Sequence, residues 1–592
     1  MNIFPITQTA LLAGQLMDTK VSTTPLIEMT SFKPEYDFNI NSSRLERCTP
    51  EEEGISSLVL AELINSLVKD KSVCLHSITI ARNGRVICEA AIGAQRLDVW
   101  KHSFSACKSV TSLAIGMLID DGVLSLDERI IDIFKDETTP LTRIKLKDLC
   151  VEDLLTMRST LTFAEGDSMT EEDWVRSFLA SPTKGAVGET FRYNSLNTYM
   201  LSAIVTKKKG VTLSEFLKER LFEPLGISDY YWEKCPKGID KGGWGLYIRP
   251  EDFLKIGQLI VNKGMYGDRR IISEEYVNLA TARHVNVQIE SDRYDYGYQI
   301  WVDKYRNSFL FNGMLGQNLI GYKDNGIVVL ANAGNSEMFQ RGNFFEYLNN
   351  AFSREFPQKL PASASGYKKL QALISSLSWY NVTTKVGIRS KLKRFFVRPT
   401  TTLGHFKYLD KNDYEVDSGD SKAVGILPLV IQSVENCYSK GFLGAGFATN
   451  DNGVPTMVYK EQETEYTIPL GFSHPEIFSL KYRNDSFLIA SSAKFTSTED
   501  DEEVLVVRLD FLETPSTKII KIYFVDDDTL KIEQSEMPGA EFMVNLTEMF
   551  MAEYTDKPII GAMLDKFGAD YIEYRIEKIF NSKLTLKKII TK

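Results

Sequence analysis

The sequence predicts an α/β (α+β) domain built on an antiparallel sheet, followed by a separate β-rich domain that forms a barrel or a sandwich. Residues 77–93 form two β-rich runs around Asn83-Gly84, a strong hairpin signal. A second pair of runs, 318–323 and 327–333, lies beyond a mostly helical stretch. This order predicts one sheet closed by both ends of the first domain, with a helical subdomain between them. Beyond residue 401, β-runs alternate with turns at a spacing typical of a barrel or sandwich.

The composition is that of a globular protein, with 43% hydrophobic and 25% charged residues in 592. The net charge of −10 comes without a strong basic cluster, which argues against nucleic acid as a partner. No apolar run reaches the roughly 18–20 residues of a transmembrane segment, and the N-terminus does not resemble a signal peptide. Seven cysteines without close pairing favour a reduced, cytoplasmic protein. Five scattered histidines and no Cys-x-x-Cys argue against zinc.

Changes in residue composition and periodicity divide the chain into four parts. We expect a lead-in over 1–45, the first domain over 46–357, a helical linker over 358–400 and the β-rich domain over 401–592, which ends in a helix. Helices of the first domain are expected over 49–71, 103–122, 146–157 and 213–221. In the last part, six β-runs lie between 466 and 534, and the final forty residues read as helical. The basic stretch 385–399 is interpreted as a solvated linker rather than a contact for an anionic surface.

The expected helix 103–122 carries the first candidate site. Its residues from 106 to 119 are apolar or small on almost every face, as in a helix at the centre of a core. Ser105 lies in its first turn, and Lys108 lies three residues later on the same face. A lysine kept neutral by burial can take the proton of an attacking serine. The plain alternative is an N-cap serine with a lysine that extends to solvent.

The Ser-x-x-Lys pattern alone is weak, because it also occurs at 181–184, 365–368, 390–393 and 491–494 in polar or loop-like surroundings. Two further segments add to it. Tyr193 lies in GETFRYNSLNTY (188–199), just before an apolar helix, and can share proton transfer with a lysine that lowers its pKa; simple packing is the alternative. The segment FNGMLGQN (311–318) places glycines beside a strand, where a ligand can approach the backbone closely.

With these three segments in order, the chain resembles the penicillin-recognising serine hydrolases, in particular class C β-lactamases, D-Ala-D-Ala carboxypeptidases and family-eight esterases. The matching residues are Ser105-Ala106-Cys107-Lys108 for Ser-x-x-Lys, Tyr193-Asn194-Ser195 for the tyrosine element and Phe311-Asn312-Gly313 in place of Lys-Thr-Gly. The connecting segments 151–161, 221–232, 242–260 and 296–302 are also similar. The likeness covers about residues 46–355.

The resemblance implies a β-lactamase/transpeptidase-like fold and a site that needs no metal or other cofactor. It assigns Ser105 as the nucleophile, with Lys108 and Tyr193 sharing the proton transfers. The oxyanion would be held by the backbone N–H groups of Ser105 and Met314. Substrate contacts are expected from Asn312, Gly313, Ser195 and Phe311, and the substrate is expected to be a small ester, amide or peptide-like molecule.

Two departures from the family pattern shift the expected activity. The tyrosine element ends in Ser195 where the family commonly has asparagine. Phe311 stands where β-lactamases and carboxypeptidases place a cation opposite the substrate carboxylate, so that charge-assisted contact is missing. We therefore expect an esterase or amidase. A carboxypeptidase or β-lactamase activity, a non-catalytic ligand-binding member of the fold and an assembly role of the C-terminal domain remain as alternatives.

Overall fold

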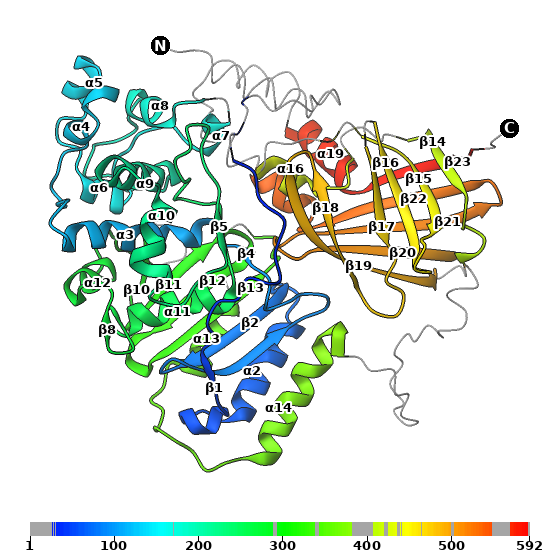
Figure 1. The fold of residues 1–592 in the computed structure, drawn as a ribbon, viewed down its shortest axis with the longest axis horizontal. Coiled ribbons are helices and arrows are strands. Elements are labelled where there is room, and N and C mark those ends of the chain that lie inside the picture. Colours follow the sequence, from blue (N-terminus) through cyan, green and yellow to red (C-terminus); the bar gives the residue numbers. More distant parts are fainter. Residues whose placement is uncertain are drawn as a thin grey trace. The chain divides into compact units, whose positions relative to one another are not determined.

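The computed structural model describes residues 27, 29, 31–169, 171–287, 293–337, 343–381, 406–419, 424–434, 439, 441–462, 464–498, 502–546 and 569–589. These residues form two compact units, which are described separately. The N-terminal unit comprises 27–92 and 96–377, and the C-terminal unit comprises 93–95 and the described residues from 378 onward. Figure 1 labels many of their helices and strands along the chain.

The N-terminal unit is organised around an eight-stranded sheet of order β1-β3-β2-β13-β12-β11-β10-β9. The short β1 is parallel to β3, and every other neighbouring pair is antiparallel. Strand β2 pairs with β13, which lies at the other end of the domain, so the predicted closure of the sheet is confirmed. The strands are β1 Glu46–Arg47, β2 Leu75–Arg82, β3 Arg85–Ala91, β9 Tyr294–Tyr296, β10 Trp301–Asp303, β11 Ser308–Gly313, β12 Gln317–Tyr322 and β13 Ile327–Ala333.

Helices cover both faces of this sheet. One face packs against a core shared with α3 (Lys108–Asp120), α9 (Ser195–Lys209) and α11 (Pro250–Val261). The other face packs against α2 (Ser57–Lys69), α13 (Asn343–Phe352) and α14 (Ala364–Leu377). Successive strand residues alternate between the two cores, as the pleat requires: Phe309 and Phe311 face the first, and Leu310 faces the second.

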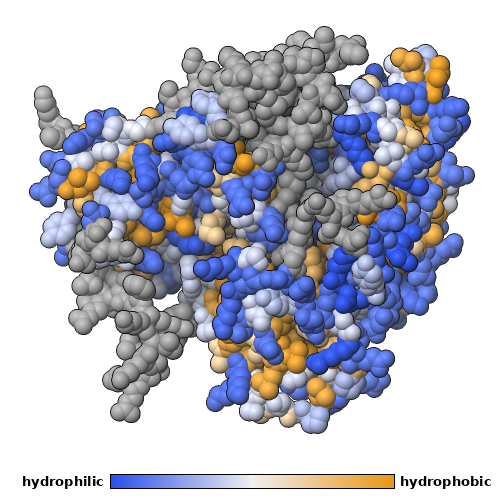
Figure 2. Space-filling view, turned by 180° about the vertical axis from the view of Figure 1, so that it is seen from behind, coloured by the Kyte–Doolittle hydropathy of each residue, from blue (hydrophilic) through white to orange (hydrophobic). Residues whose placement is uncertain are grey.

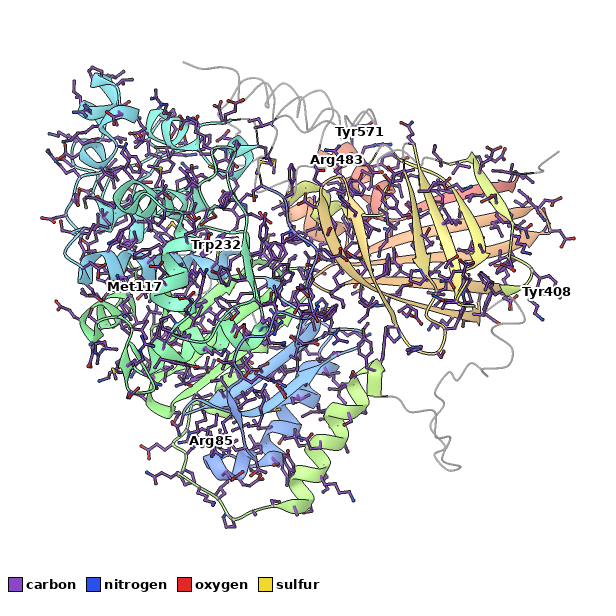
Figure 3. All side chains as sticks on the ribbon, viewed as in Figure 1. Arg85, Met117, Trp232, Tyr408, Arg483 and Tyr571 are labelled. Carbon is purple, nitrogen blue, oxygen red and sulfur yellow. The ribbon has the colours of Figure 1, made fainter. Side chains whose placement is uncertain are left out.

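The remaining elements of this unit are short. They are the turns η1 Pro50–Glu53, η2 Phe104–Cys107, η3 Lys135–Glu137, η4 Lys218–Phe222, η5 Met314–Gly316 and η6 Lys323–Asn325, the helices α4 Ile130–Ile133, α5 Pro140–Lys145, α6 Val151–Leu155, α7 Glu165–Ser168, α8 Trp174–Ala180, α10 Leu213–Leu217 and α12 Glu274–Ala280, and the strands β4 Lys101–His102, β5 Tyr230–Trp232, β6 Leu246–Ile248, β7 Met265–Tyr266 and β8 Arg269–Arg270. In Figure 3, Met117 marks α3 and Trp232 marks the end of β5; both side chains are buried.

The expected helices exist, but several are shorter than predicted or are divided. The helix expected over 49–71 splits into η1 and α2, because Gly54 adopts a left-handed φ of 69° between them. The helix expected over 103–122 begins with η2, a 3-10 turn, before α3. The segment 146–157 is helical only over α6.

Helix α14 lies within the range 358–400 that we expected to link the domains. It packs against α2 and β3, and Leu370 is fully buried there. Its packing belongs to the N-terminal unit. The basic stretch 385–399 lies outside the described residues.

The C-terminal unit contains a ten-stranded antiparallel sheet of order β17-β16-β15-β14-β23-β22-β21-β20-β19-β18. The terminal strands β17 and β18 lie close together, so the sheet forms a nearly closed barrel around an apolar core. Its strands are β14 Asp413–Ser418, β15 Phe442–Thr449, β16 Pro455–Glu461, β17 Glu465–Pro469, β18 Glu476–Tyr482, β19 Asp485–Ser497, β20 Glu503–Phe511, β21 Thr517–Asp526, β22 Thr529–Met537 and β23 Ser582–Lys588; η7 Trp379–Asn381, α16 Leu429–Val434 and α19 Ala569–Phe580 complete the unit.

All six β-runs expected between 466 and 534 are strands. The expected C-terminal helix is present as α19, but the prediction that the chain ends in a helix is wrong, because β23 follows it. Leu584 and Leu586 of β23 alternate into the barrel core, and this two-residue period is that of a strand. Residues 547–568 lie outside the described part.

We next consider the hydropathy of the surface and of the helices. The face of the molecule in Figure 2 is mainly hydrophilic, with apolar residues in small groups. Over the described ranges, no helix is both long and apolar enough to cross a bilayer.

Candidate active site

Ser105 lies in η2, between strand β4 and helix α3. Among residues 101–118 it is the residue that is not buried, so its hydroxyl can be reached from solvent. The preceding residue, Phe104, has a φ of 48°, a left-handed conformation that is costly for a residue with a side chain. Its ring packs edge-on against His102, with centroids 4.0 Å apart. The chain therefore turns sharply just before the serine, and the buried neighbours hold it in place.

Lys108 is the first residue of α3 and is only 1% exposed. Its Nζ donates hydrogen bonds to Ser105 Oγ at 2.8 Å, to Ser195 Oγ at 2.8 Å and to the Gly243 carbonyl oxygen at 2.7 Å. Burial lowers the pKa of the Lys108 amine to about 8, and this effect outweighs the opposing attraction of the Glu165 carboxylate.

These three partners define what a neutral Lys108 can do. A carbonyl oxygen only accepts hydrogen bonds, so Gly243 fixes one N–H of the amine. The Ser195 hydroxyl can accept a second N–H. A neutral amine has two hydrogens and one lone pair, and the lone pair then faces the remaining partner, the Ser105 hydroxyl. The geometry therefore suits removal of the proton from Ser105.

Tyr193 lies beside the same pair. Its ring centroid is 5.1 Å from Lys108 Nζ, and its hydroxyl is hydrogen-bonded to Ser105. Burial raises the pKa of the Tyr193 phenol above its usual value, although the hydrogen bond with Ser105 opposes the rise. The structure thus contradicts the lowered tyrosine pKa that we considered from the sequence. Tyr193 stays neutral at physiological pH and can donate or pass on a proton without carrying a charge.

Asn194 fixes the second motif at the start of α9. Its Oδ1 accepts a hydrogen bond from Leu196 N at 2.9 Å, which is the N-cap interaction, and its Nδ2 donates to the carbonyls of Leu161 and Phe163. Asn194 is therefore structural, and the next residue, Ser195, contacts Lys108 from the first turn of the helix.

The backbone of the third motif approaches the chain before Ser105 closely at Gly313. A Cβ on Gly313 would lie 2.4 Å from the carbonyl oxygen of Ser103, so only glycine allows β11 to approach the chain just before the nucleophile. Met314 begins η5, which contacts η2. Asn312 points to the face of β11 opposite to that of Phe311 and Gly313, because successive residues of a strand alternate between its faces.

The Phe311 side chain lies in the hydrophobic core. It is fully buried, with ring centroids 5.6 Å from Phe309 and 5.9 Å from Phe253. Its surroundings are those of a core residue, so the sequence-based assignment of Phe311 to substrate binding receives no support from its position.

Two features of the site escaped the sequence reasoning. A Cβ on Gly243 would lie 2.6 Å from the Ser195 carbonyl oxygen, so this glycine is what brings an acceptor within reach of Lys108. The sequence signal for this close approach is the pair Gly242-Gly243, in the segment 242–260 that connects the motifs. The second feature is Glu165 of α7, which acts electrostatically on both Lys108 and Tyr193; no sequence pattern marked it.

A helix-flanked sheet with Ser-x-x-Lys at the start of a buried helix is the arrangement of the β-lactamase/transpeptidase-like fold. The model of the family named Beta-lactamase, a family of generally hydrolytic serine enzymes, matches residues 60–346 of the chain. The resemblance stated from the motifs is confirmed. No curated protein sequence gives a significant match.

Several solved structures are similar to the chain. A putative 6-aminohexanoate-dimer hydrolase from Bacillus anthracis is 16% identical with a TM-score of 0.44, over 58% of this chain and 92% of that one. A family VIII carboxylesterase is 16% identical with a TM-score of 0.43, over 53% and 100%. An octameric penicillin-binding protein homologue from Pyrococcus abyssi is 16% identical with a TM-score of 0.41, over 80% and 98%. Likeness at this level says nothing about the substrate.

Proposed function

We propose that the protein is a serine hydrolase that cleaves ester or amide bonds through an acyl-enzyme on Ser105. The observation that carries this proposal is the buried Lys108 amine, whose pKa is lowered to about 8 and whose Nζ lies 2.8 Å from Ser105 Oγ. A buried lysine that contacts neutral acceptors and a partly exposed serine is suited to general-base catalysis.

In the acylation step, neutral Lys108 takes the Ser105 proton while Ser105 Oγ bonds to the substrate carbonyl carbon. The tetrahedral oxyanion is held by the backbone N–H groups of Ser105 and Met314. The bond from carbon to the leaving alcohol or amine then breaks. Tyr193 passes the proton from Lys108 to that leaving group, which requires no net charge on the phenol.

Water completes the cycle by the same groups. Lys108, neutral again, accepts a proton from the attacking water, the ester bond to Ser105 breaks, and the proton returns to Ser105 Oγ. Ser195 keeps one N–H of Lys108 engaged throughout, so the lone pair stays directed toward the reacting oxygen. Removal of an oxyanion donor in such enzymes lowers the rate by about 100–1,000-fold.

Esterase or amidase activity fits the third motif better than β-lactamase or carboxypeptidase activity. The residue at the position of the family's carboxylate-binding cation is Phe311, and it is buried in the core. A substrate carboxylate would find no charged partner there, which removes a contact that typically contributes about 1.5–3 kcal/mol.

The test is covalent labelling with a small serine-directed fluorophosphonate, followed by mass mapping of the adduct. We expect one adduct on Ser105, none in Ser105→Ala, and an unchanged circular dichroism spectrum in that variant. Burst kinetics with a 4-nitrophenyl ester would then show the acyl-enzyme. An adduct on another serine would refute the assignment, and absence of any adduct would favour the non-catalytic ligand-binding alternative.

A further inference from the structure

The active site contains one carboxylate for which the proposed reaction has no use. Glu165 lies in the first turn of α7, and its side chain is partly exposed. Its charge acts on both Lys108 and Tyr193, the two groups that handle the proton. In the described part of the chain, no hydrogen bond or ion pair of the Glu165 carboxylate is seen, and Lys108 Nζ is a cation beside the Tyr193 ring.

The position of Glu165 beside the second motif is built into the chain. The Asn194 amide, between Tyr193 and Ser195, donates to the carbonyls of Leu161 and Phe163 at 3.1 and 2.9 Å. The next turn is closed by the hydrogen bond from Ala164 N to Asp167 Oδ2 at 3.1 Å. The backbone that carries Glu165 is thus fixed at both sides, two residues from an anchor on the tyrosine motif.

Aromatic rings pack around Tyr193, the tyrosine of the second motif. Trp301 stacks on Tyr193 with centroids 5.9 Å apart, and Tyr296 meets Tyr193 edge-on at 6.3 Å. Phe191 packs against both Tyr296 and Trp301, and the residues Phe191, Tyr193 and Trp301 are each partly exposed. Aromatic faces attract cations as well as apolar groups.

The charges at the site in the state with neutral Lys108 also favour binding of a cation. When Lys108 is neutral, as general-base action requires, the Glu165 carboxylate still acts on the reacting groups without the Lys108 ammonium to offset it. Such a site repels a carboxylate-bearing ligand and attracts a cation. We propose that Glu165 and the aromatic rings around Tyr193 recognise a positively charged nitrogen, so that the substrates are esters or amides that carry an ammonium group near the scissile bond. This inference rests on the proposed hydrolase function.

The test compares two phosphonate 4-nitrophenyl esters of the same shape. One carries a 3-(trimethylammonio)propyl group, and the other carries its uncharged tert-butyl analogue, so the pair differs only in charge. Each forms a bond from phosphorus to Ser105 Oγ and releases 4-nitrophenolate, and the Ser105 proton goes to Lys108. The second-order rate constant of labelling is measured for each probe from the released nitrophenolate.

We expect the cationic probe to react at least about tenfold faster than its neutral analogue, the lower end for a charge-assisted contact. Glu165→Gln should bring this ratio close to one. Both probes are measured at the same pH, so a change in the Lys108 pKa in that variant affects both rates equally and does not change the ratio. The matched control is Glu172→Gln, which removes the same charge from an exposed glutamate close in sequence and should keep the wild-type ratio.

Two results would overturn the inference. One is equal rates for the two probes in the wild-type protein. The other is an unchanged ratio in Glu165→Gln, and an equal loss for both probes in that variant would mean that Glu165 serves the nucleophile. Failure of both probes on a protein that a small fluorophosphonate labels at Ser105 would also count against it. If the fluorophosphonate itself gives no Ser105 adduct, the proposed hydrolase function fails first.

Discussion

The reactivity of Ser105 should depend on pH through Lys108. An ordinary lysine has a pKa of 10.5, and burial lowers that of Lys108 to about 8. At pH 7.5 about a quarter of the Lys108 amines are then neutral, compared with about one in a thousand for an exposed lysine. Burial thus increases the fraction of Lys108 in the neutral, basic form at pH 7.5 by more than about 200-fold.

The sign of the effect follows from which form is reactive. The ammonium form cannot accept the Ser105 proton, so labelling should slow by about tenfold for each pH unit below about 7 and reach a plateau above about 9. The Glu165 carboxylate stabilises the ammonium form, so Glu165→Gln should move the midpoint to a lower pH.

The assay is the second-order rate constant for labelling by an uncharged fluorophosphonate between pH 5.5 and 10. Glu172→Gln is the control and should keep the wild-type midpoint. A rate that does not change with pH, a midpoint close to that of an exposed lysine, or a midpoint that Glu165→Gln moves upward would refute the role given to Lys108.

Two substitutions test the surroundings of Lys108, and a third tests the position of Phe311 in the third motif. Ser195→Ala removes one of its acceptors and should lower kcat by about 10–100-fold with little change in Tm, measured by ester hydrolysis and thermal melting. Gly243→Ala places a Cβ 2.6 Å from the Ser195 carbonyl oxygen, so both kcat and Tm should fall; unchanged values would contradict the close approach. Phe311→Lys puts an unpaired amine into the core and should cost more than about 3 kcal/mol in urea unfolding, rather than create penicillinase activity.

Much of the first domain could be predicted because its signals are local. Asn83-Gly84 fixes the β2–β3 hairpin, since both residues adopt positive φ, at 51° and 82°. The uniformly apolar run after Ser105 correctly indicated a central helix. The nearly closed barrel was less visible, because β15 contains Gly444 and Gly446, which weaken a strand signal.

What the sequence could not show is the set of contacts between distant segments. The Gly243 carbonyl reaches Lys108 across 135 positions in the chain, and the Asn194 amide meets Phe163 across 31. A motif position alone also does not show where a side chain points. The position of Phe311 in the third motif suggested a site residue, but strand alternation directs its ring into the core. Motif order predicted the family, whereas burial and partners decide what each side chain can do.

A bound cation should itself change the state of Lys108. The Glu165 carboxylate raises the pKa of Lys108 in the free protein, and an ammonium group paired with that carboxylate would cancel this effect. The midpoint of kcat, which reports the enzyme–substrate complex, should therefore lie at lower pH than the midpoint of kcat/KM for a cationic ester. For its neutral isostere the two midpoints should differ less, because Glu165 stays unpaired. Steady-state rates for both esters across the pH range decide this, with Glu165→Gln as the variant in which the difference disappears. Equal separations of the midpoints for the two esters would show that recognition of the cation and activation of the general base are independent.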